Sequence, residues 1–412
     1  MPPQQSSTPA TPTQRLQSLD AFRGLIMLFM ASAGLGLPKI ADRFPDSTLW
    51  QIIKFHTTHA LWVGGGAWDM IQPCFMFMVG VAVPFSSARR SQSGEDAWTQ
   101  HRHTLLRSCI LVALGVFLAT GSKSQPDFIF TNVLCQIGLG YPALKLLAGR
   151  GMRIQLAAMA GIGLVSWLAF ALHSPALSAA ATAAQNLTAT DLETLKATFG
   201  LPTDHLSEVL LPGFFGHWSM NTNAAAAFDT WFLNLFPREK PFVFNNGGYQ
   251  TLNFIPSLIT MTLGLVAGER LRSEQSGSDK LRTLLTQGGL CVALGLLLGA
   301  TVCPLVKRIW TPSWAVYSGG IATILLATFY WVIDLGGRRA WSVPLQIVGT
   351  NSIAIYLAAQ LLSPWIRTTA KTYLGNALFS GPYGIVAERS VTLMALWLFC
   401  YWLHRNRFFI RV

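Results

Sequence analysis

The sequence predicts an all-α polytopic membrane protein, a bundle of about ten transmembrane helices with one long extracytoplasmic loop. Of the 412 residues, 51% are hydrophobic and only 12% are charged, which is about half the charged share of an ordinary soluble protein. Apolar runs suited to crossing about 30 Å of hydrocarbon recur along the whole chain. The basic residues, which give a net charge of +12, stand in short clusters between those runs.

The chain is expected to begin with a disordered cytoplasmic tail over residues 1–17. This segment is rich in Pro, Gln, Ser and Thr and lacks the apolar core that a signal peptide needs. Residues 18–412 are then expected to form one transmembrane domain. Its expected spans are 19–37, 70–87, 105–120, 132–147, 154–172, 252–271, 284–305, 313–335, 342–362 and 389–404.

The loops predict how these spans are oriented. Clusters of arginine and lysine follow every even-numbered span, for example Arg270 and Arg272 after the sixth. Since positive residues are retained in the cytoplasm, both termini are expected there. The protein is therefore predicted to be integral to a membrane, in a bacterium the inner one, and in contact with its lipids. Nucleic acid is a poor candidate partner, because the basic residues form neither one face nor one tail.

Two outward segments, 38–68 and 173–250, follow odd-numbered spans. The long one carries many aromatic and amide side chains, and a loop of that length without a function is uncommon. We expect it to form a cap over a site beneath it. The residues expected to bind the substrate are Trp62, Asn245, Asn246 and Tyr249.

The stretch from His59 to Asp69 predicts that site. The two titratable residues lie ten positions apart at the entrance of the second span, with Gly64, Gly65 and Gly66 between them. Such glycines can bend the backbone so that the two side chains converge. A histidine beside a carboxylate can act as a general base. His56 is a second candidate, and the pattern alone does not choose between the two histidines.

Further polar residues stand inside predicted spans. Asp20 and Arg23 share one face of the first helix and can pair there, either as a cap with a snorkelling arginine or as a site for a phosphate-bearing ligand. Gln136 and Asn351 are amides that either bridge helices or line a polar channel. The six cysteines show no metal-ligand spacing, so no metal is expected.

These motifs resemble those of a known family. The opening Leu19-Asp20-Ala21-Phe22-Arg23-Gly24, the His59-Ala60-x-Trp62-x-Gly64 stretch with Asp69, and the segments Gln136-Ile137-Gly138 and Gly349-Thr350-Asn351-Ser352 are similar to the transmembrane acyltransferases related to heparan-α-glucosaminide N-acetyltransferase. The resemblance covers nearly the whole chain.

The resemblance implies transfer of an acetyl group from cytoplasmic acetyl-CoA to an amine or hydroxyl of an extracytoplasmic sugar or glycan. It singles out His59 as the catalytic residue, with Asp69 to orient it, and leaves open direct transfer or an acyl-histidine. Whether the protein is a homodimer is also open. The residues expected to hold acetyl-CoA are Asp20, Arg23, Arg89, Arg90, Arg107, Gln136 and Asn351.

The resemblance is incomplete at two places. Gly34 stands where the family has a first-helix asparagine near the acetyl group, and residues 244–250 lack the family's acidic sequence. These differences keep a second hypothesis open, a non-catalytic transporter or a sugar- or lipid-binding membrane protein on the same scaffold.

Overall fold

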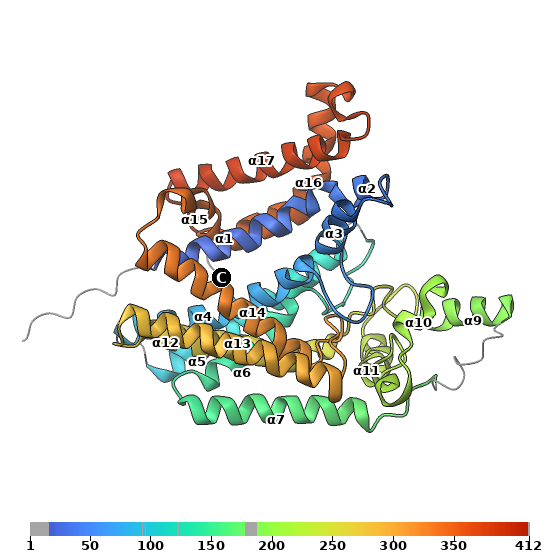
Figure 1. Cartoon of the computed structure of the whole chain (residues 1–412), viewed down its shortest axis with the longest axis horizontal. Helices are drawn as coiled ribbons and strands as arrows, with labels where there is room; N and C mark the ends of the chain where they lie inside the picture. The colour runs from blue at the N-terminus through green and yellow to red at the C-terminus, as the bar shows by residue number, and fades with distance from the viewer. Residues whose placement is uncertain (1–15, 93, 95, 122, 178–187, 411–412) are drawn as a thin grey trace, which may run out of the picture.

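A computed structural model describes residues 16–410 apart from 93, 95, 122 and 178–187 (Figure 1). The described chain is helical and holds no β-strand, only isolated bridges. The elements that form the bundle are α1 Gln17–Ser32, α4 Ile71–Gln92, α5 Ala97–Thr120, α6 Val133–Leu147, α7 Met152–Ala171, α12 Phe254–Arg272, α13 Gly277–Thr301, α14 Pro312–Phe329 with η7 Tyr330–Leu335, α15 Val343–Gly349, α16 Ser352–Leu374 and α17 Gly384–Arg405.

The remaining elements are short and lie mostly at one end of the bundle. They are η1 Ala33–Gly36, α2 Leu37–Ala41, α3 Thr48–Thr57, η2 Ala67–Met70, α9 Ala189–Phe199, η3 Thr203–His205, α10 Leu206–Val209, η4 Gly213–Trp218, α11 Ala224–Phe232, η5 Leu233–Leu235, η6 Thr251–Asn253, η8 Ala340–Ser342 and η9 Asn376–Phe379.

The fold class is confirmed. Within the described residues, eight helices are long and apolar enough to span a membrane, or nine when a bent pair counts as one span. Each of the ten expected segments overlaps an apolar helix, but two differ from an ordinary span. Helix α6 has only 15 residues, about 22 Å of rise, and the ninth segment is broken between α15 and α16 by a bend of 69°.

Helix α12 lies at the centre of the bundle and α7 at its edge. In the apolar window of α12, 78% of the residues are buried, against 11% in α7. The helix α12 packs closely on α4 because glycines replace side chains at the contact. A Cβ atom on Gly264 would stand 2.0 Å from the Phe77 carbonyl oxygen, and one on Gly268 2.5 Å from that of Val81. This Gly-x-x-x-Gly spacing is a common device for close packing of membrane helices.

The first helix depends on distant parts of the chain. Its opening amides, those of Gln17 and Ser18, donate to the two carboxylate oxygens of Asp334 at 3.1 and 3.4 Å, which caps the positive end of the helix. The expected tail includes Gln17, but this cap makes it the first helical residue instead. Leu16 directly precedes the helix, and residues 1–15 of the expected tail lie outside the described residues.

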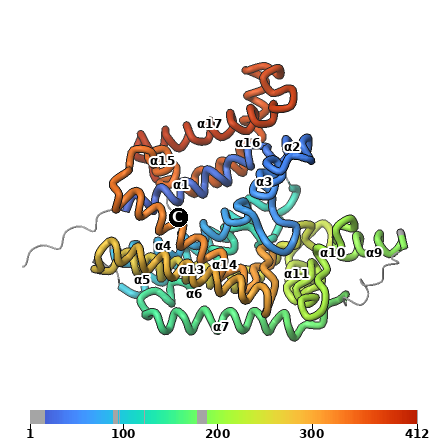
Figure 2. The backbone as a smooth tube through the Cα atoms, viewed as in Figure 1, coloured from blue at the N-terminus to red at the C-terminus, as the bar shows by residue number. Residues whose placement is uncertain are grey.

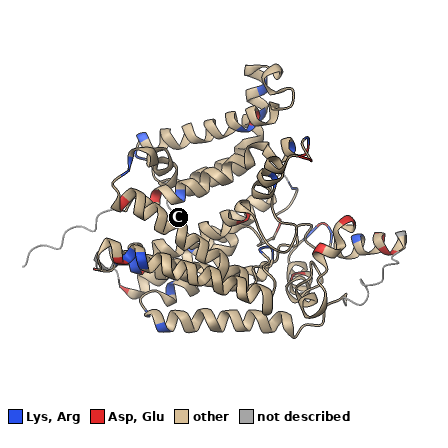
Figure 3. Ribbon diagram, in the orientation of Figure 1, with Lys and Arg blue, Asp and Glu red and all other residues tan. Residues whose placement is uncertain are grey.

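The expected long loop forms a small helical unit at one end of the bundle. Helices α9, α10 and α11 lie there together, beside the end of α7 (Figure 1). The tube in Figure 2 brings α3, this unit and the chain leading into α14 to the same end. Their shared apolar core includes Trp62, Phe170, Trp218 and Val306. Lysine and arginine gather at the opposite end, near the turn between α12 and α13 (Figure 3).

Candidate active site

A bent segment between α3 and η2 brings His59 and Asp69 together. The amide of Gly64 donates to the Leu305 carbonyl at 2.8 Å, and its φ of +88° is one that side chains rarely adopt. Gly66 passes so close to the Phe55 carbonyl that a Cβ there would lie 2.3 Å from its oxygen. The expected role of the glycines is therefore confirmed: they let the chain fold back on itself.

His59 and Asp69 form a close pair. The distance from His59 Nδ1 to Asp69 Oδ1 is 2.7 Å. Since an ionised carboxylate only accepts, the hydrogen lies on Nδ1, and in the neutral ring the lone pair is then on Nε2. The second oxygen, Oδ2, accepts from the amides of Ala60 and Gly66 at 3.0 and 3.2 Å. Asp69 is 1% exposed and the His59 side chain 40% exposed. The buried carboxylate therefore fixes one edge of the ring, and the rest of the ring remains accessible.

Lys307 is the third member of this cluster, and it is not among the residues predicted from the sequence. Its Nζ donates to Asp69 Oδ1 at 3.1 Å and lies 3.0 Å from His59 Nδ1. Burial, which leaves Lys307 4% exposed, lowers the pKa of its ammonium from 10.5 to about 8, although Asp69 opposes that change. The buried carboxylate therefore has an ammonium on one side and an imidazole on the other.

One sequence signal pointed to Lys307. The pair Lys307-Arg308 follows the seventh predicted span, on the side where the positive-inside rule predicts few basic residues. A basic pair on the outward side is an exception that indicates a specific use.

Arg308 ties the His59 segment to the outward unit. Its guanidinium donates to the carbonyls of Gly247 at 2.6 Å and Ala60 at 3.1 Å, and it lies 5.5 Å from the centre of the Tyr249 ring. The ring of Tyr249 also lies 5.9 Å from Lys307 Nζ. Tyr249 therefore covers both cations, which is a cation–π arrangement.

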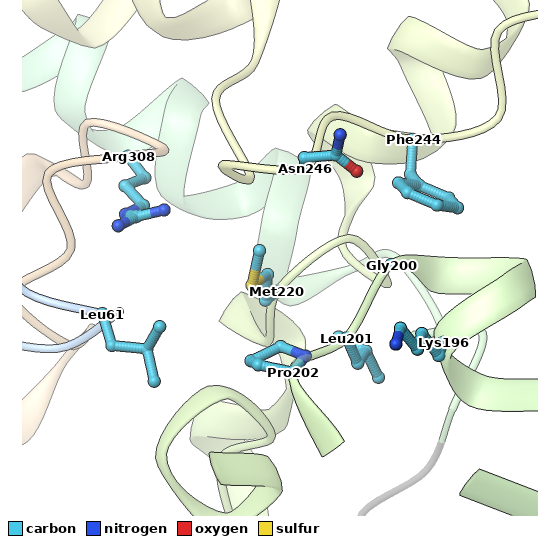
Figure 4. A pocket seen from close by; sticks show the side chains of 9 residues that line it. All are labelled: Leu61, Lys196, Gly200, Leu201, Pro202, Met220, Phe244, Asn246 and Arg308. Carbon is cyan, nitrogen blue, oxygen red and sulfur yellow. The ribbon is translucent and has the colours of Figure 1, made fainter. Parts of the chain in front are cut away.

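A pocket of about 320 Å³ opens beside this segment (Figure 4). Arg308 and Leu61 line one side of it, Lys196 and Phe244 the other, and Asn246 lies between them. The remaining lining residues are Gly200, Leu201, Pro202 and Met220. Leu61 is two residues from His59, so the pocket and the His59 cluster share one backbone segment.

The four expected substrate residues separate in the structure. Asn246 lines the pocket, and Tyr249 lies against the two cations. Trp62 is 1% exposed, and its indole nitrogen donates to the Trp218 carbonyl at 2.9 Å. The carboxamide oxygen of Asn245 accepts from the amides of Gly247 and Tyr249. Trp62 and Asn245 thus shape the site from within rather than lining its pocket.

The expected donor residues are spread over the bundle. Arg23 NH1 lies 3.8 Å from Asp20 Oδ1, so the predicted pair forms. Arg107 donates to the Tyr141 hydroxyl at 3.2 Å and lies over its ring. Arg89 and Arg90 belong to the last turns of α4, and the side chains of both lie outside the part of the chain that the structure describes.

The two amides bridge distant segments. Gln136 is buried and donates to the carbonyls of Phe130 at 2.8 Å and Thr251 at 3.1 Å. Asn351 lies in the break between α15 and α16, and its Oδ1 accepts from the Ile410 amide at 3.1 Å. Within the described chain, Gln136 Oε1 and Asn351 Nδ2 have no hydrogen-bond partner. Each amide therefore joins segments and keeps one polar atom available.

Comparisons with known proteins agree with the resemblance. No family model matches the chain. It is 22% identical to heparan-alpha-glucosaminide N-acetyltransferase of Homo sapiens over 434 residues, covering 97% of this chain and 60% of the human protein. Against the Mus musculus enzyme it is 24% identical over 396 residues, 87% of this chain and 55% of that protein. The chain is thus a distant, family-level relative that spans less than two thirds of their length.

Proposed function

We propose that this distant relative of heparan-alpha-glucosaminide N-acetyltransferase is a membrane acyltransferase that moves an acetyl group from acetyl-CoA to an amine or hydroxyl of a sugar. The observation that carries the proposal is the His59 cluster. A buried carboxylate holds the Nδ1 of His59, which leaves the Nε2 of the neutral ring free to act as a general base.

In direct transfer, His59 Nε2 removes a proton from the acceptor as the acceptor nitrogen or oxygen attacks the thioester carbon. The C–S bond breaks, and the proton passes from His59 to the departing CoA sulfur. The products are an amide or ester and free CoA. Asp69 stabilises the transient imidazolium, and Lys307 is a positioning residue that helps to hold the carboxylate in place.

An acyl-histidine is the competing route. There Nε2 attacks the thioester first, CoA leaves, and the acceptor takes the acetyl group from the ring in a second step. Acid-quenched protein incubated with acetyl-CoA alone, analysed by mass spectrometry, separates the two routes. An added acetyl group on the peptide that contains His59 supports the second route.

The donor would approach from the end of the bundle that carries most arginines. Arg23 lies ten residues before Ala33 along the first helical segment, which is about 15 Å by helical rise. A CoA phosphate paired with Arg23 leaves the pantetheine arm to extend toward the His59 end. Arg107, Gln136 and Asn351 are further candidate contacts.

The acceptor would lie in the pocket beside Leu61. Asn246 supplies hydrogen-bonding groups to a sugar there, while Lys196 and Arg308 supply positive charge. A sugar that carries an anionic group fits this lining best. With the predicted topology, this pocket faces away from the cytoplasm.

The test is acetyl transfer by the purified protein in detergent, with radiolabelled acetyl-CoA and a panel of amino sugars. We expect His59→Gln to reduce transfer at least about 100-fold, the usual order for loss of a general base. His56→Gln is the matched control, because this histidine lies three residues earlier and its Nδ1 accepts from the Ala67 amide instead of contacting Asp69. Equal transfer by His59→Gln and the wild type would refute the role of His59.

One observation favours the non-catalytic alternative. Gly34, where the family has an asparagine, lies in η1 directly after α1. Its φ is +63°, and a Cβ there would be 3.3 Å from the Thr57 carbonyl oxygen. A position next to the His59 segment therefore lacks a side chain. Thermal-shift measurements separate the hypotheses: stabilisation by acetyl-CoA supports the enzyme, and stabilisation by sugars or lipids alone supports a transporter or binding protein.

A further inference from the structure

A second pocket lies between α1, α16 and α17, outside the site described above. Its volume is about 270 Å³. It is lined by small and apolar residues, by hydroxyl and amide side chains and by two arginines: Met30, Ala31, Ala33, Ala359, Gln360, Ser363, Pro364, Arg367, Arg389 and Thr392. Neither arginine takes part in the proposed reaction.

The lining changes from apolar to cationic along the helices. On α16 the order is Ala359, Ser363 and then Arg367, which lies seven residues before the helix ends at Leu374, about 10 Å by helical rise. On α17, Arg389 lies five residues after the helix begins at Gly384, about 8 Å from that end. The two arginines therefore lie about one and a half to two turns inside the adjoining ends of these helices.

The pocket carries an excess of positive charge. Glu388 is 3.5 Å from Arg367 Nε and 2.6 Å from Lys371 Nζ, so one carboxylate serves two cations. Arg389, also on α17, adds a third cation, and its Nε is buried without a partner among the described residues. Lys371 is 42% exposed and lies outside the pocket lining, so the lining itself carries two arginines that share the one carboxylate of Glu388 with it. Such charge inside a membrane protein is costly and is usually retained for a ligand.

The surface around the pocket is apolar and exposed, which suits contact with the hydrocarbon of a bilayer. Phe29 on α1, Leu361 and Trp365 on α16, and Met394 on α17 are all exposed, and only 22% of the apolar window of α17 is buried. A ligand can therefore reach the arginines sideways, from the hydrocarbon layer. The volume is below the range of about 300–1,000 Å³ that encloses a whole small molecule, which suits a headgroup whose chains stay outside.

We propose that this pocket binds the phosphate of an anionic membrane lipid. The guanidinium groups of Arg367 and Arg389 donate to the phosphate oxygens in the forked geometry that arginine offers to phosphate. The glycerol region lies against Ser363 and Gln360, and the acyl chains extend past Ala359 and Met30 into the bilayer. The site is independent of acetyl transfer.

The test measures lipid binding to the full-length protein by native mass spectrometry, with thermal shift in a neutral detergent as a second readout. Phosphatidylglycerol is the probe, and dioleoylglycerol, which lacks the phosphate, is its matched control. We expect Arg367→Gln/Arg389→Gln to weaken phosphatidylglycerol binding at least tenfold. Arg153→Gln, a change of an exposed arginine at the start of α7, should leave binding unchanged.

Two further arms keep the outcome decisive. Inorganic phosphate and CoA are tested at the same concentrations, and tighter binding of either than of phosphatidylglycerol would overturn the lipid assignment. If the double variant fails to fold, Ala359→Phe fills the apolar end of the pocket without touching a charge and should also weaken lipid binding. Unchanged binding in either folded variant would refute the site.

Discussion

The buried contact between Asp69 and Lys307 makes a prediction that separates folding from chemistry. In Asp69→Asn, Lys307 loses its anionic partner at 3.1 Å while remaining 4% exposed. Removing one member of a buried ion pair typically costs about 3–5 kcal/mol. Because burial already lowers the pKa of Lys307 to about 8, the ammonium can lose its proton, and we expect the lower end of that range.

Lys307→Met leaves the carboxylate with three hydrogen bonds, from His59 Nδ1 and from the amides of Ala60 and Gly66. Its cost should therefore be smaller, about 1–3 kcal/mol, the usual penalty for losing one partner of a buried polar group. In the double variant Asp69→Asn/Lys307→Met no buried charge remains at this point. The double variant should therefore lose much less unfolding free energy than the sum of the losses in the two single variants.

The assay is thermal unfolding in detergent for all four proteins, followed by acetyl transfer for each. We expect a coupling energy above about 1 kcal/mol. We expect no recovery of activity in the double variant, because the neutral carboxamide that replaces the carboxylate cannot stabilise the His59 imidazolium. If the stability loss of the double variant equals the sum of the two single losses within about 0.5 kcal/mol, the margin for independent sites, the ion pair between Asp69 and Lys307 is refuted. Full activity of the double variant would refute the role of Asp69 in the chemistry.

Two further predictions concern the fold. Burial raises the pKa of Asp229 from 3.8 to about 6, so the folded protein binds this proton more tightly, and stability should fall by up to about 3 kcal/mol as the pH rises from about 4 to about 6. Unfolding curves at both pH values should show this loss in the wild type and not in Asp229→Asn. Gly24→Ala places a Cβ 1.8 Å from the Leu345 carbonyl oxygen, whereas Gly161→Ala meets open space. The first should lower the unfolding temperature clearly by overpacking and the second should not, so equal effects would contradict the close approach of α1 and α15.

Hydropathy predicted the helices because each apolar run is a local property of the chain. It did not distinguish α6, whose 15 residues read like any other apolar run, or the 69° break before α16. At that break Asn351 makes a tertiary contact with the Ile410 amide, which local hydropathy does not register.

The same limit applies to the site. His59 and Asp69 lie ten residues apart, close enough for the glycine pattern between them to predict their contact. Lys307 reaches the same carboxylate from 238 residues away, and no local pattern joins those positions. Trp62 and Asn245 are expected to bind substrate because they stand in the outward segments, whereas their side chains are used for hydrogen bonds within the fold.

The carboxylate of Asp334 has a consequence for the order of biosynthesis. The first helix leaves the ribosome long before this residue, which lies 317 positions after Gln17. Until the chain has been extended that far, the opening amides of α1 lack their partner, and the α15 carbonyl that meets Gly24 has not yet been made. The first span therefore enters the membrane before the residues that cap it and pack against Gly24 have been synthesised. Its final position is settled near the end of translation, so a chain that stops after α13 should leave α1 unanchored and open to membrane proteases.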